Sequence, residues 1–234
     1  MNAMVYDVRD FMGACVDSYL TLAGRTADSL HKVETPFLPA AGDAMPETAD
    51  EDCGSTGILA AIASKVLMKI LYGARMGRWD LLKIISLLAS RVTKWSPNCD
   101  RALHRVISYI HCTLDTVQWC YVAKDSTLDT IEVQLHADAD LAGERPSFRS
   151  TSGNLLSIQA KFTDFLVSCR SKTEKFASCS TPESELASAS RGMRAMAMPA
   201  LDLLDFIAGR PVPMTLREDN EAAISIIRTG IPPT

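Results

Sequence analysis

Ile131-Glu132-Val133-Gln134-Leu135-His136-Ala137-Asp138-Ala139-Asp140 is the stretch of sequence from which the fold can be read. Apolar and polar residues alternate from 131 to 136, which is the period of a half-buried β-strand. The strand pattern ends in two acidic residues, Asp138 and Asp140, which share one face of a strand. The sequence therefore predicts a strand that carries a carboxylate at its end.

Two further acidic segments follow. Ser180-Thr181-Pro182-Glu183-Ser184-Glu185 opens a helical pattern, and Leu216-Arg217-Glu218-Asp219-Asn220 ends an apolar strand pattern. Carboxylates that separate elements bring together are the hard oxygen ligands of divalent cations in phosphodiester hydrolases. A structural role is the alternative for each one alone, because such residues also cap helices and complement the helix dipole.

The second half of the chain alternates between strands and helices. Further strand patterns cover residues 117–121, 154–160, 164–169 and 214–218. Helical patterns cover residues 182–206, interrupted at Pro199, and 220–228. From residue 131 onward, the predicted order is three strands, a helix, a strand and a helix. This order fits an α/β sheet with helices packed on it. The apolar residues of the long helical pattern are expected in the core: Met193, Met196, Met198, Leu201, Leu203 and Leu204.

The first half is predicted to be helical. Helical patterns cover residues 58–72 and 79–92, and Ser96-Pro97 is typical of a helix start. Residues 1–32 predict a short amphipathic helix, and residues 33–57, with six acidic and no basic residues, predict an exposed linker. The predicted parts are therefore an N-terminal segment (1–32), a linker (33–57), a helical region (58–115) and an α/β domain (116–234).

Basic residues gather in the helical region. From Ile58 to Lys124 there are ten Lys or Arg against three Asp, a local net charge of +7 in a chain whose net charge is −4. Such a block can follow a phosphate backbone, and ordinary solvated helix faces are the alternative.

The cysteines and the hydropathy of the chain predict where in the cell the protein is found. The seven cysteines form no Cys-x-x-Cys pair, and the first residues lack the apolar core of a secretory leader. We expect reduced thiols and an intracellular protein, cytoplasmic or nuclear. Lys65 and Lys69 interrupt the longest apolar stretch, so no membrane span is expected. No zinc site is expected at His104, His111 and Cys112, because no second ligand pair follows.

Four segments in order carry a resemblance to a known family. They are residues 136–143, Arg149-Ser150-Thr151-Ser152-Gly153, residues 180–187 and residues 216–224. They resemble the ribonuclease H domain of copia-type retrotransposon Pol polyproteins. That family has an Asp-Ala-Asp strand end, an Arg-Ser-Thr-Ser-Gly turn, a Ser-Thr-Glu-Ala-Glu helix start and a Cys-Asp-Asn-Gln strand end. Looser matches at residues 33–36, 67–80 and 96–112 extend the resemblance to about residues 15–230.

The sequence also departs from this pattern. Pro182 and Ser184 stand where the family usually has Glu and Ala, and Glu218 and Glu221 flank Asp219-Asn220. Residues 220–234 contain neither Asp nor His, whereas the family has a fourth metal-site carboxylate in a His-x-Asp context beyond the Asp-Asn strand. The polymerase motif Tyr-x-Asp-Asp is absent. The resemblance thus implies a ribonuclease H domain that is truncated at its C-terminal end.

The resemblance implies a ribonuclease H-like mixed sheet with packing helices, preceded by an α-helical connection region from the end of a reverse transcriptase. It implies two Mg²⁺ ions, or Mn²⁺, about 4 Å apart at a site that cuts the RNA strand of RNA–DNA hybrids. Asp138 would bridge both ions, Glu185 would bind one ion and contact a ribose hydroxyl, and Asp219 would hold the ion of the attacking water. Asp140 and Glu183 are second choices for the roles of Asp138 and Glu185, because a shift of one or two residues in the alignment with the family would exchange them.

The expected partners are an RNA–DNA hybrid and the rest of the Pol polyprotein, with no membrane. Arg149, Arg170, Lys172 and Asn220 are the expected contacts to nucleic acid, and plain surface polar residues are the alternative. Three functions remain open: an active endonuclease, a catalytically inactive retroelement remnant that at most binds nucleic acid, and an unrelated α/β interaction module.

Overall fold

The computed structural model describes residues 2–38, 55–144 and 148–230. The chain divides into two compact units, a helical unit of Tyr6–Gln118 and a sheet unit of Trp119–Thr234 together with Met1–Val5. The division after Gln118 lies close to the predicted start of the α/β domain at residue 116. Most of the predicted linker, residues 39–54, lies outside the described residues.

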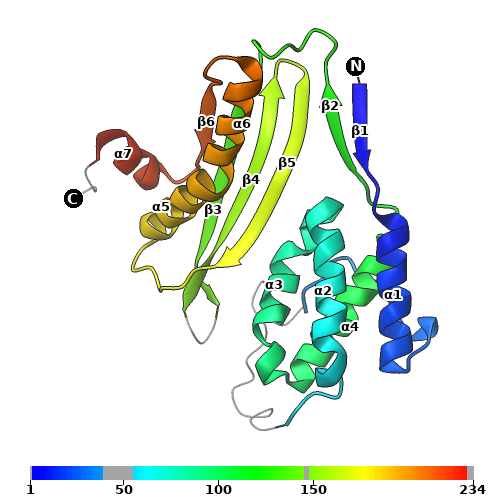
Figure 1. Cartoon of the computed structure of the whole chain (residues 1–234). Helices are drawn as coiled ribbons and strands as arrows, with labels where there is room; N and C mark the ends of the chain where they lie inside the picture. The colour runs from blue at the N-terminus through cyan, green and yellow to red at the C-terminus, as the bar shows by residue number, and fades with distance from the viewer. Residues whose placement is uncertain (1, 39–54, 145–147, 231–234) are drawn as a thin grey trace. The chain divides into compact units, whose positions relative to one another are not determined.

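The described residues of the helical unit form four α-helices (Figure 1). They are α1 (Arg9–Ala23), α2 (Ala60–Gly77), α3 (Leu82–Ser90) and α4 (Pro97–Cys112), with short 3-10 turns η1 (Ala27–Ser29), η2 (Trp79–Leu81) and η3 (Val92–Lys94). The predicted start of α4 is confirmed, because the Ser96 side chain caps the helix by accepting a hydrogen bond from the Cys99 N–H and Pro97 occupies its first turn.

A buried carboxylate ties the start of α2 to α4. Asp100 accepts hydrogen bonds from the backbone N–H groups of Ile58 (2.7 Å) and Leu59 (3.1 Å) and from the indole Nε1–H of Trp95 (2.6 Å). Ile58 and Leu59 lie directly before α2, where backbone N–H groups have no intrahelical partners. Asp100 satisfies these donors and thereby links the start of α2 to the first turn of α4.

His104, one of the three residues considered above for a zinc site, has a structural role. The Nδ1 atom of His104 lies 2.9 Å from the Tyr19 hydroxyl, and Nε2 lies 2.9 Å from the Ser29 carbonyl oxygen. A carbonyl only accepts, so Nε2 carries the proton and Nδ1 accepts from Tyr19. Burial lowers the pKa of His104, which favours the neutral ring. Both ring nitrogens are therefore engaged inside the helical unit.

Several cations of the basic block also stabilise this unit. Arg78 is 1% exposed, pairs with Asp80 (2.8 Å) and donates to the Thr113 carbonyl oxygen (3.0 Å). Lys69 Nζ donates to the carbonyl oxygen of Ala14 at 2.7 Å. These side chains hold helices and loops together, so the local charge of +7 is not all available to a phosphate backbone.

The sheet unit contains a six-stranded sheet in the order β1-β2-β5-β4-β3-β6 (Figure 1). The strands are β1 (Asn2–Tyr6), β2 (Gln118–Val122), β3 (Glu132–Glu144), β4 (Arg149–Ala160), β5 (Thr163–Thr173) and β6 (Met214–Arg217). The pairs β2–β5, β5–β4 and β4–β3 are antiparallel, and β3–β6 is parallel. The prediction of an α/β fold with a mixed sheet and packing helices is confirmed.

Two details of the sheet differ from the predictions. The segment from Arg149 to Gly153, expected as a turn, is the first part of strand β4. Ser150 and Ser152 in it are 0% and 1% exposed, and Ser150 accepts a backbone hydrogen bond from Glu174 at 2.8 Å. Pairing with β3 and β5 thus outweighs the local turn preference of Ser and Gly. Strand β1 was not predicted.

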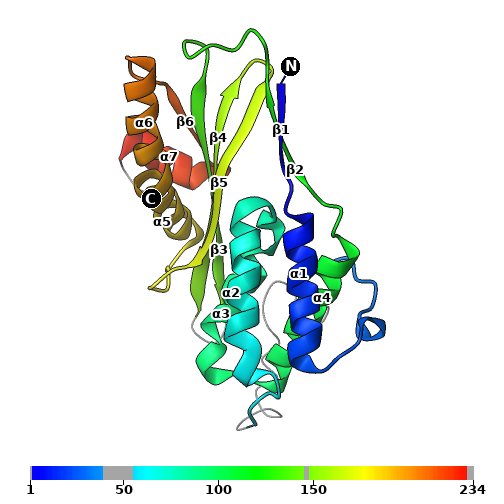
Figure 2. The ribbon, with the colours of Figure 1, turned by 45° about the vertical axis from the view of Figure 1, so that its right-hand side comes forward.

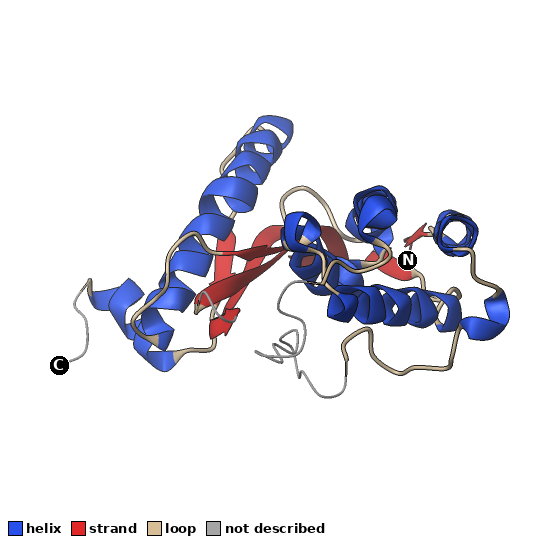
Figure 3. Cartoon of the chain, turned by 90° about the horizontal axis from the view of Figure 1, so that it is seen from below, coloured by secondary structure: helices blue, strands red, loops and turns tan. Residues whose placement is uncertain are grey.

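Helices cover one face of this sheet (Figures 2 and 3). The chain runs through α5 (Thr181–Gly192), a π-helical turn η4 (Met193–Ala197) and α6 (Met198–Ala208), and ends with α7 (Glu221–Thr229). No break occurs at Pro199, because it lies in the first turn of α6, where its missing N–H costs little.

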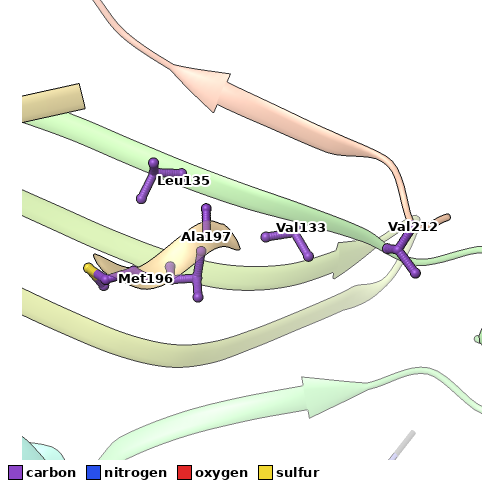
Figure 4. Packing of buried hydrophobic residues seen from close by; sticks show 6 residues of the cluster. Val133, Leu135, Met196, Ala197 and Val212 are labelled. Carbon is purple, nitrogen blue, oxygen red and sulfur yellow. The ribbon is translucent and has the colours of Figure 1, made fainter. Parts of the chain in front are cut away.

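The core lies between the sheet and these helices (Figure 4). Val133 and Leu135 of β3, both 0% exposed, pack with Met196 and Ala197 of η4 and with Val212. The prediction that six apolar residues of this helical stretch lie in the core was wrong for two of them. Met198 and Leu203 are 52% and 59% exposed, because α6 turns only one side toward the sheet.

Small residues let α5 approach the sheet closely. Ser188, which is 0% exposed, donates to the Asp138 carbonyl oxygen at 2.8 Å, and the Asn154 amide donates to the Ser188 carbonyl oxygen at 3.2 Å. One turn later, a Cβ atom on Gly192 would lie 2.8 Å from the Asn154 Nδ2 atom and 3.1 Å from the Leu135 side chain. A helix this close to β3 fixes the position of its N-terminal residues relative to the end of that strand.

We expect Gly192→Ala to lower the free energy of unfolding by about 2 kcal/mol, because the added methyl displaces the anchored Asn154 amide. Gly13→Ala in α1 is the matched control. Nothing lies within 4 Å of a Cβ there, so the same exchange should stabilise its helix by up to about 1 kcal/mol. Urea unfolding of both variants measures the effects, and equal changes of the same sign would contradict the close approach of α5.

Candidate metal centre

Three of the predicted carboxylates lie where two strands stop pairing. Strand β3 pairs with β6 from Val133 to His136, and β6 ends at Arg217. Asp138 therefore lies on β3 just past the last paired residue, and Asp219 follows just past the end of β6. The gap that opens between parallel strands beyond their pairing leaves room for side chains and ligands.

Glu185 reaches the same place from α5. The helix begins at the Ser180 cap, which accepts a hydrogen bond from the Glu183 N–H at 3.4 Å. Glu185 and Ser188 are separated by three residues, so they share the side of the helix that faces β3. The bond from Ser188 to the Asp138 carbonyl oxygen thus also fixes where Glu185 points.

One carboxylate oxygen from each of Asp138, Glu185 and Asp219 lies within 4.8 Å of the other two. We call these residues the acidic triad. Asp138 and Asp219 are exposed, whereas Glu185 is only 4% exposed. Hard oxygen ligands that converge from three elements could hold a divalent cation, and among the described residues this is the only such group of three or more His, Cys, Asp or Glu side chains.

The buried member of the triad, Glu185, lies in an environment unlike that of a surface acid. The Ala139 N–H hydrogen-bonds to the Glu185 carboxyl group, whereas the Oε2 atom is buried without a hydrogen-bond partner. Burial, and then the negative charges of Glu218, Asp138 and Asp219, raise the pKa of Glu185 to about 7. Burying the charged form of an acid without a counter-charge costs free energy, and a bound cation would offset that cost.

A fourth carboxyl group lies beside the triad, and the sequence analysis did not assign it a role. Glu218 directly precedes Asp219; its Oε1 atom accepts a hydrogen bond from the Asn220 N–H at 3.2 Å, and its Oε2 atom is buried without a hydrogen-bond partner. Burial, together with the charges of Asp219 and Asp138, raises the pKa of Glu218. The sequence signal that could have pointed to Glu218 was its position directly after the predicted strand that forms β6.

The two second-choice carboxylates have other partners. Asp140 accepts a hydrogen bond from the Thr151 N–H, within the β3–β4 hairpin. Glu183 accepts one from the Cys179 N–H at 2.7 Å, which is a capping interaction at the start of α5. The structure therefore separates Asp138 from Asp140 and Glu185 from Glu183, which the sequence left open.

Arg149 lies on the face of the sheet that carries Asp138. Asp138 pairs with Gly153 of β4, and Arg149 precedes Gly153 by four residues. Side chains alternate along a strand, so an even separation keeps both on one face. Arg149 is exposed there.

The other three residues predicted to contact nucleic acid do not share the position of Arg149. Arg170 and Lys172 flank Ser171, the β5 partner of Gly153, so they lie on the opposite face, which α5 covers in part. The Asn220 side chain caps α7 by accepting a hydrogen bond from the Ala223 N–H at 2.9 Å. Arg149 is therefore the predicted cation that shares a face of the sheet with Asp138.

No family model, curated protein or solved structure matches this chain. The geometry of the site is therefore the basis for its function. Within the described part of the chain, no helix combines the length and the apolar character that crossing a lipid bilayer requires.

The raised pKa of Glu185 gives the metal-free protein a distinct dependence on pH. Glu185 holds its proton more tightly in the folded chain, where its pKa is about 7, than in the unfolded chain, where 4.5 is usual. Its contribution to stability is therefore complete below pH 4.5 and is lost as the pH rises through 7. In EDTA, we expect Glu185→Gln to match the wild type at pH 4.5 and to exceed it by about 2 kcal/mol at pH 8. Urea unfolding at the two pH values measures this difference, and a constant difference would contradict it.

Proposed function

We propose that this chain is a metal-dependent endonuclease of the ribonuclease H type, which cuts the RNA strand of RNA–DNA hybrids. The observation that carries the proposal is the convergence of Asp138, Glu185 and Asp219 within 4.8 Å of one another. These residues come from strand β3, from the first turns of α5 and from the segment just after β6, the parallel neighbour of β3. The resemblance to copia-type ribonuclease H domains names the same three residues.

The mixed sheet with helices on one face is compatible with a ribonuclease H-like fold, which we propose for the sheet unit. Antiparallel β3, β4 and β5 are followed by α5, and β6 then pairs in parallel with β3. The helical unit corresponds in this proposal to the connection region of a reverse transcriptase.

The chemistry needs a cation and a surface for the substrate. Divalent cations at such a site supply an activated water and neutralise the charge of the phosphate. The exposed carboxylates of Asp138 and Asp219 face solvent, from which a phosphodiester would approach. Glu185 holds its position from the buried side through the Ala139 N–H, and it must release its proton to act as a charged ligand.

The face that carries Asp138 also has features that suit nucleic acid. Arg149 is a cation on that face. The register of β2, β5, β4 and β3 puts Tyr121 on it as well. The rings of Trp119 and Tyr121 stack with centroids 6.3 Å apart, and the two side chains are 49% and 37% exposed. Exposed rings on a sheet stack with bases or sugars, and Arg binds phosphate.

The test is cleavage of end-labelled substrates in Mg²⁺ or Mn²⁺. We expect cuts in the RNA strand of an RNA–DNA hybrid that leave a 5′-phosphate and a 3′-hydroxyl, and no cuts in duplex DNA or duplex RNA. EDTA should stop the reaction. Binding of the hybrid without any cleavage would favour the inactive remnant, and neither binding nor cleavage would favour the unrelated interaction module.

A further inference from the structure

Helix α6 is apolar on two sides, although one side faces the sheet and the other is turned away from it (Figure 2). Its inner side packs against the core with Ala200, Leu201, Leu204 and Ala208. Its outer side carries four large apolar side chains that are each more than half exposed: Met198, Leu203, Phe206 and Ile207. A helix that is apolar all round is typically buried all round. The outer side of α6 is therefore expected to be covered by a partner.

These side chains belong to two neighbouring ridges of the helix. Residues four apart in a helix lie along one ridge. The first ridge is Arg194, Met198, Asp202 and Phe206, and the second is Ala195, Pro199, Leu203 and Ile207. All eight residues are exposed and six of them are apolar, and we call them the α6 ridge surface. A contiguous apolar surface marks an interaction site, whereas single exposed apolar residues do not.

The two charged residues of this surface decide which partner fits it. Arg194 and Asp202 lie four residues before and four residues after Met198, so the α6 ridge surface has no net charge. A phosphate backbone or an anionic lipid surface attracts an excess of cations, and Asp202 among the apolar residues opposes both. One positive and one negative charge on either side of a centre can instead match a second copy of the same surface.

An antiparallel pair of α6 helices brings complementary residues together. In such a twofold pair, residues equally far before and after the centre face each other. With the centre at Pro199, Ala195 faces Leu203 of the second copy, because each lies four residues from the centre. A small side chain thus meets a large one on both sides of the centre, which lets the two helices approach closely.

The same centre also places the charges well. Arg194 lies five residues before Pro199, so it falls between Asp202 and Phe206 of the second copy, which lie three and seven residues after it. A carboxylate and an aromatic ring both attract a guanidinium group. Arg194 uses its Nε atom for the Ser190 carbonyl oxygen at 3.3 Å, and its exposed side chain can offer its Nη atoms to the second copy.

We infer that two copies of this chain associate through the α6 ridge surface in an antiparallel, twofold-symmetric dimer. Twofold symmetry makes every contact occur twice, so an Arg194–Asp202 pair flanks the centre on each side. The inference goes beyond the proposed function and does not depend on it, because none of the acidic triad residues belongs to this surface.

Sedimentation velocity of the full-length chain, in EDTA and without nucleic acid, measures the association. We expect a dimer with a Kd of about 10 µM. Phe206→Glu should raise the Kd about a hundredfold or more, because Phe206 is 85% exposed in the single chain and its replacement puts a charge into an apolar contact. Phe162→Glu is the matched control, since Phe162 is 64% exposed at the turn between β4 and β5. Its replacement should leave the Kd within about threefold of the wild-type value.

Reversal of the two charges tests the antiparallel arrangement. Arg194→Asp alone places carboxylates beside each other twice, and Asp202→Arg alone does the same with guanidinium groups. Each variant should therefore raise the Kd about thirtyfold or more. In an equal mixture of the two variants, one chain carries two acids and the other carries two bases, so opposite charges meet again at both places. We expect this mixture to form a heterodimer with a Kd within about threefold of the wild-type value. Far-ultraviolet circular dichroism verifies that each variant is folded.

The outcomes bear on separate parts of the inference. A wild-type chain that stays monomeric at about 100 µM would overturn the dimer, in favour of a different protein as the partner of this surface. A dimer that Phe206→Glu weakens no more than Phe162→Glu does would place the interface elsewhere and would also overturn it. A mixture of the two charge variants that stays monomeric would overturn the antiparallel arrangement.

Discussion

Replacing Asp138 by Asn is expected to lower the rate of hybrid cleavage in Mg²⁺ by about a thousandfold or more, which is about 4 kcal/mol of transition-state stabilisation. Asp138 supplies the triad oxygen that comes from strand β3, and it would be a charged ligand of a divalent cation bound there. Asn offers a neutral oxygen in the same position, so the cation loses a charged ligand while the backbone of β3 keeps its pairing. Single-turnover cleavage of a labelled hybrid measures the rate.

Asp140→Asn is the matched control for this experiment. It is the same chemical change two residues away on the same strand, but Asp140 is bound to the Thr151 N–H and lies outside the triad. We expect its rate to stay within about threefold of the wild-type rate. Equal losses in the two variants would mean that the effect comes from the hairpin and not from a metal site.

Replacing Asp100 by Ala is expected to lower the free energy of unfolding of the helical unit by about 4 kcal/mol. Asp100 accepts hydrogen bonds from the backbone N–H groups of Ile58 and Leu59 and from the Trp95 indole. Its removal leaves three donors without their acceptor, at about 1–3 kcal/mol for each buried one. Urea unfolding followed by the helical signal in circular dichroism measures this change.

Asp115→Ala is the control for the loss of one negative charge. Asp115 lies exposed beyond the end of α4, and its replacement is expected to change the free energy of unfolding by less than about 0.5 kcal/mol. Similar effects in both variants would show that net charge, and not the hydrogen bonds of Asp100, stabilises the unit.

The central part of the site was predictable from sequence, because it depends on alternation and on the ends of elements. Residues 131–136 alternate strictly, so the strand and the face of Asp138 follow from a period of two. The predicted end of this strand at Asp138 was wrong, because pairing with β4 carries β3 on to Glu144. The start of α5 was marked by Ser180 and Pro182, so the position of Glu185 near the start of a helix could also be predicted.

The choice between neighbouring carboxylates required the tertiary structure. Asp138 and Asp140 share a face, and Glu183 and Glu185 both lie in the first turns of one helix. Asp140 accepts a hydrogen bond from the Thr151 N–H, and Glu183 accepts one from the Cys179 N–H. These donors come from other segments, so they could not be predicted from the spacing of the carboxylates. Glu218 was overlooked because its environment depends on how Glu185 packs, which sequence spacing does not reveal.

Other parts of the fold lacked a local signal. Strand β1 is an edge strand whose residues are mostly exposed, so its sequence shows no alternation between apolar and polar positions. The π-helical turn at Met193–Ala197 keeps its apolar residues on one side much as an α-helix does. Strand β4 begins in a segment rich in Ser, whose extended form depends on its two neighbouring strands.

The most direct test of the central claim is a crystal of the chain soaked in Mn²⁺ and measured at a wavelength where manganese scatters anomalously. The account predicts an anomalous difference peak where the pairing of β3 with β6 ends, within about 2.2 Å of carboxylate oxygens of Asp138, Glu185 and Asp219. A well-ordered triad without such a peak at millimolar Mn²⁺, or a peak on other residues alone, would contradict the claim that these three carboxylates form a metal centre.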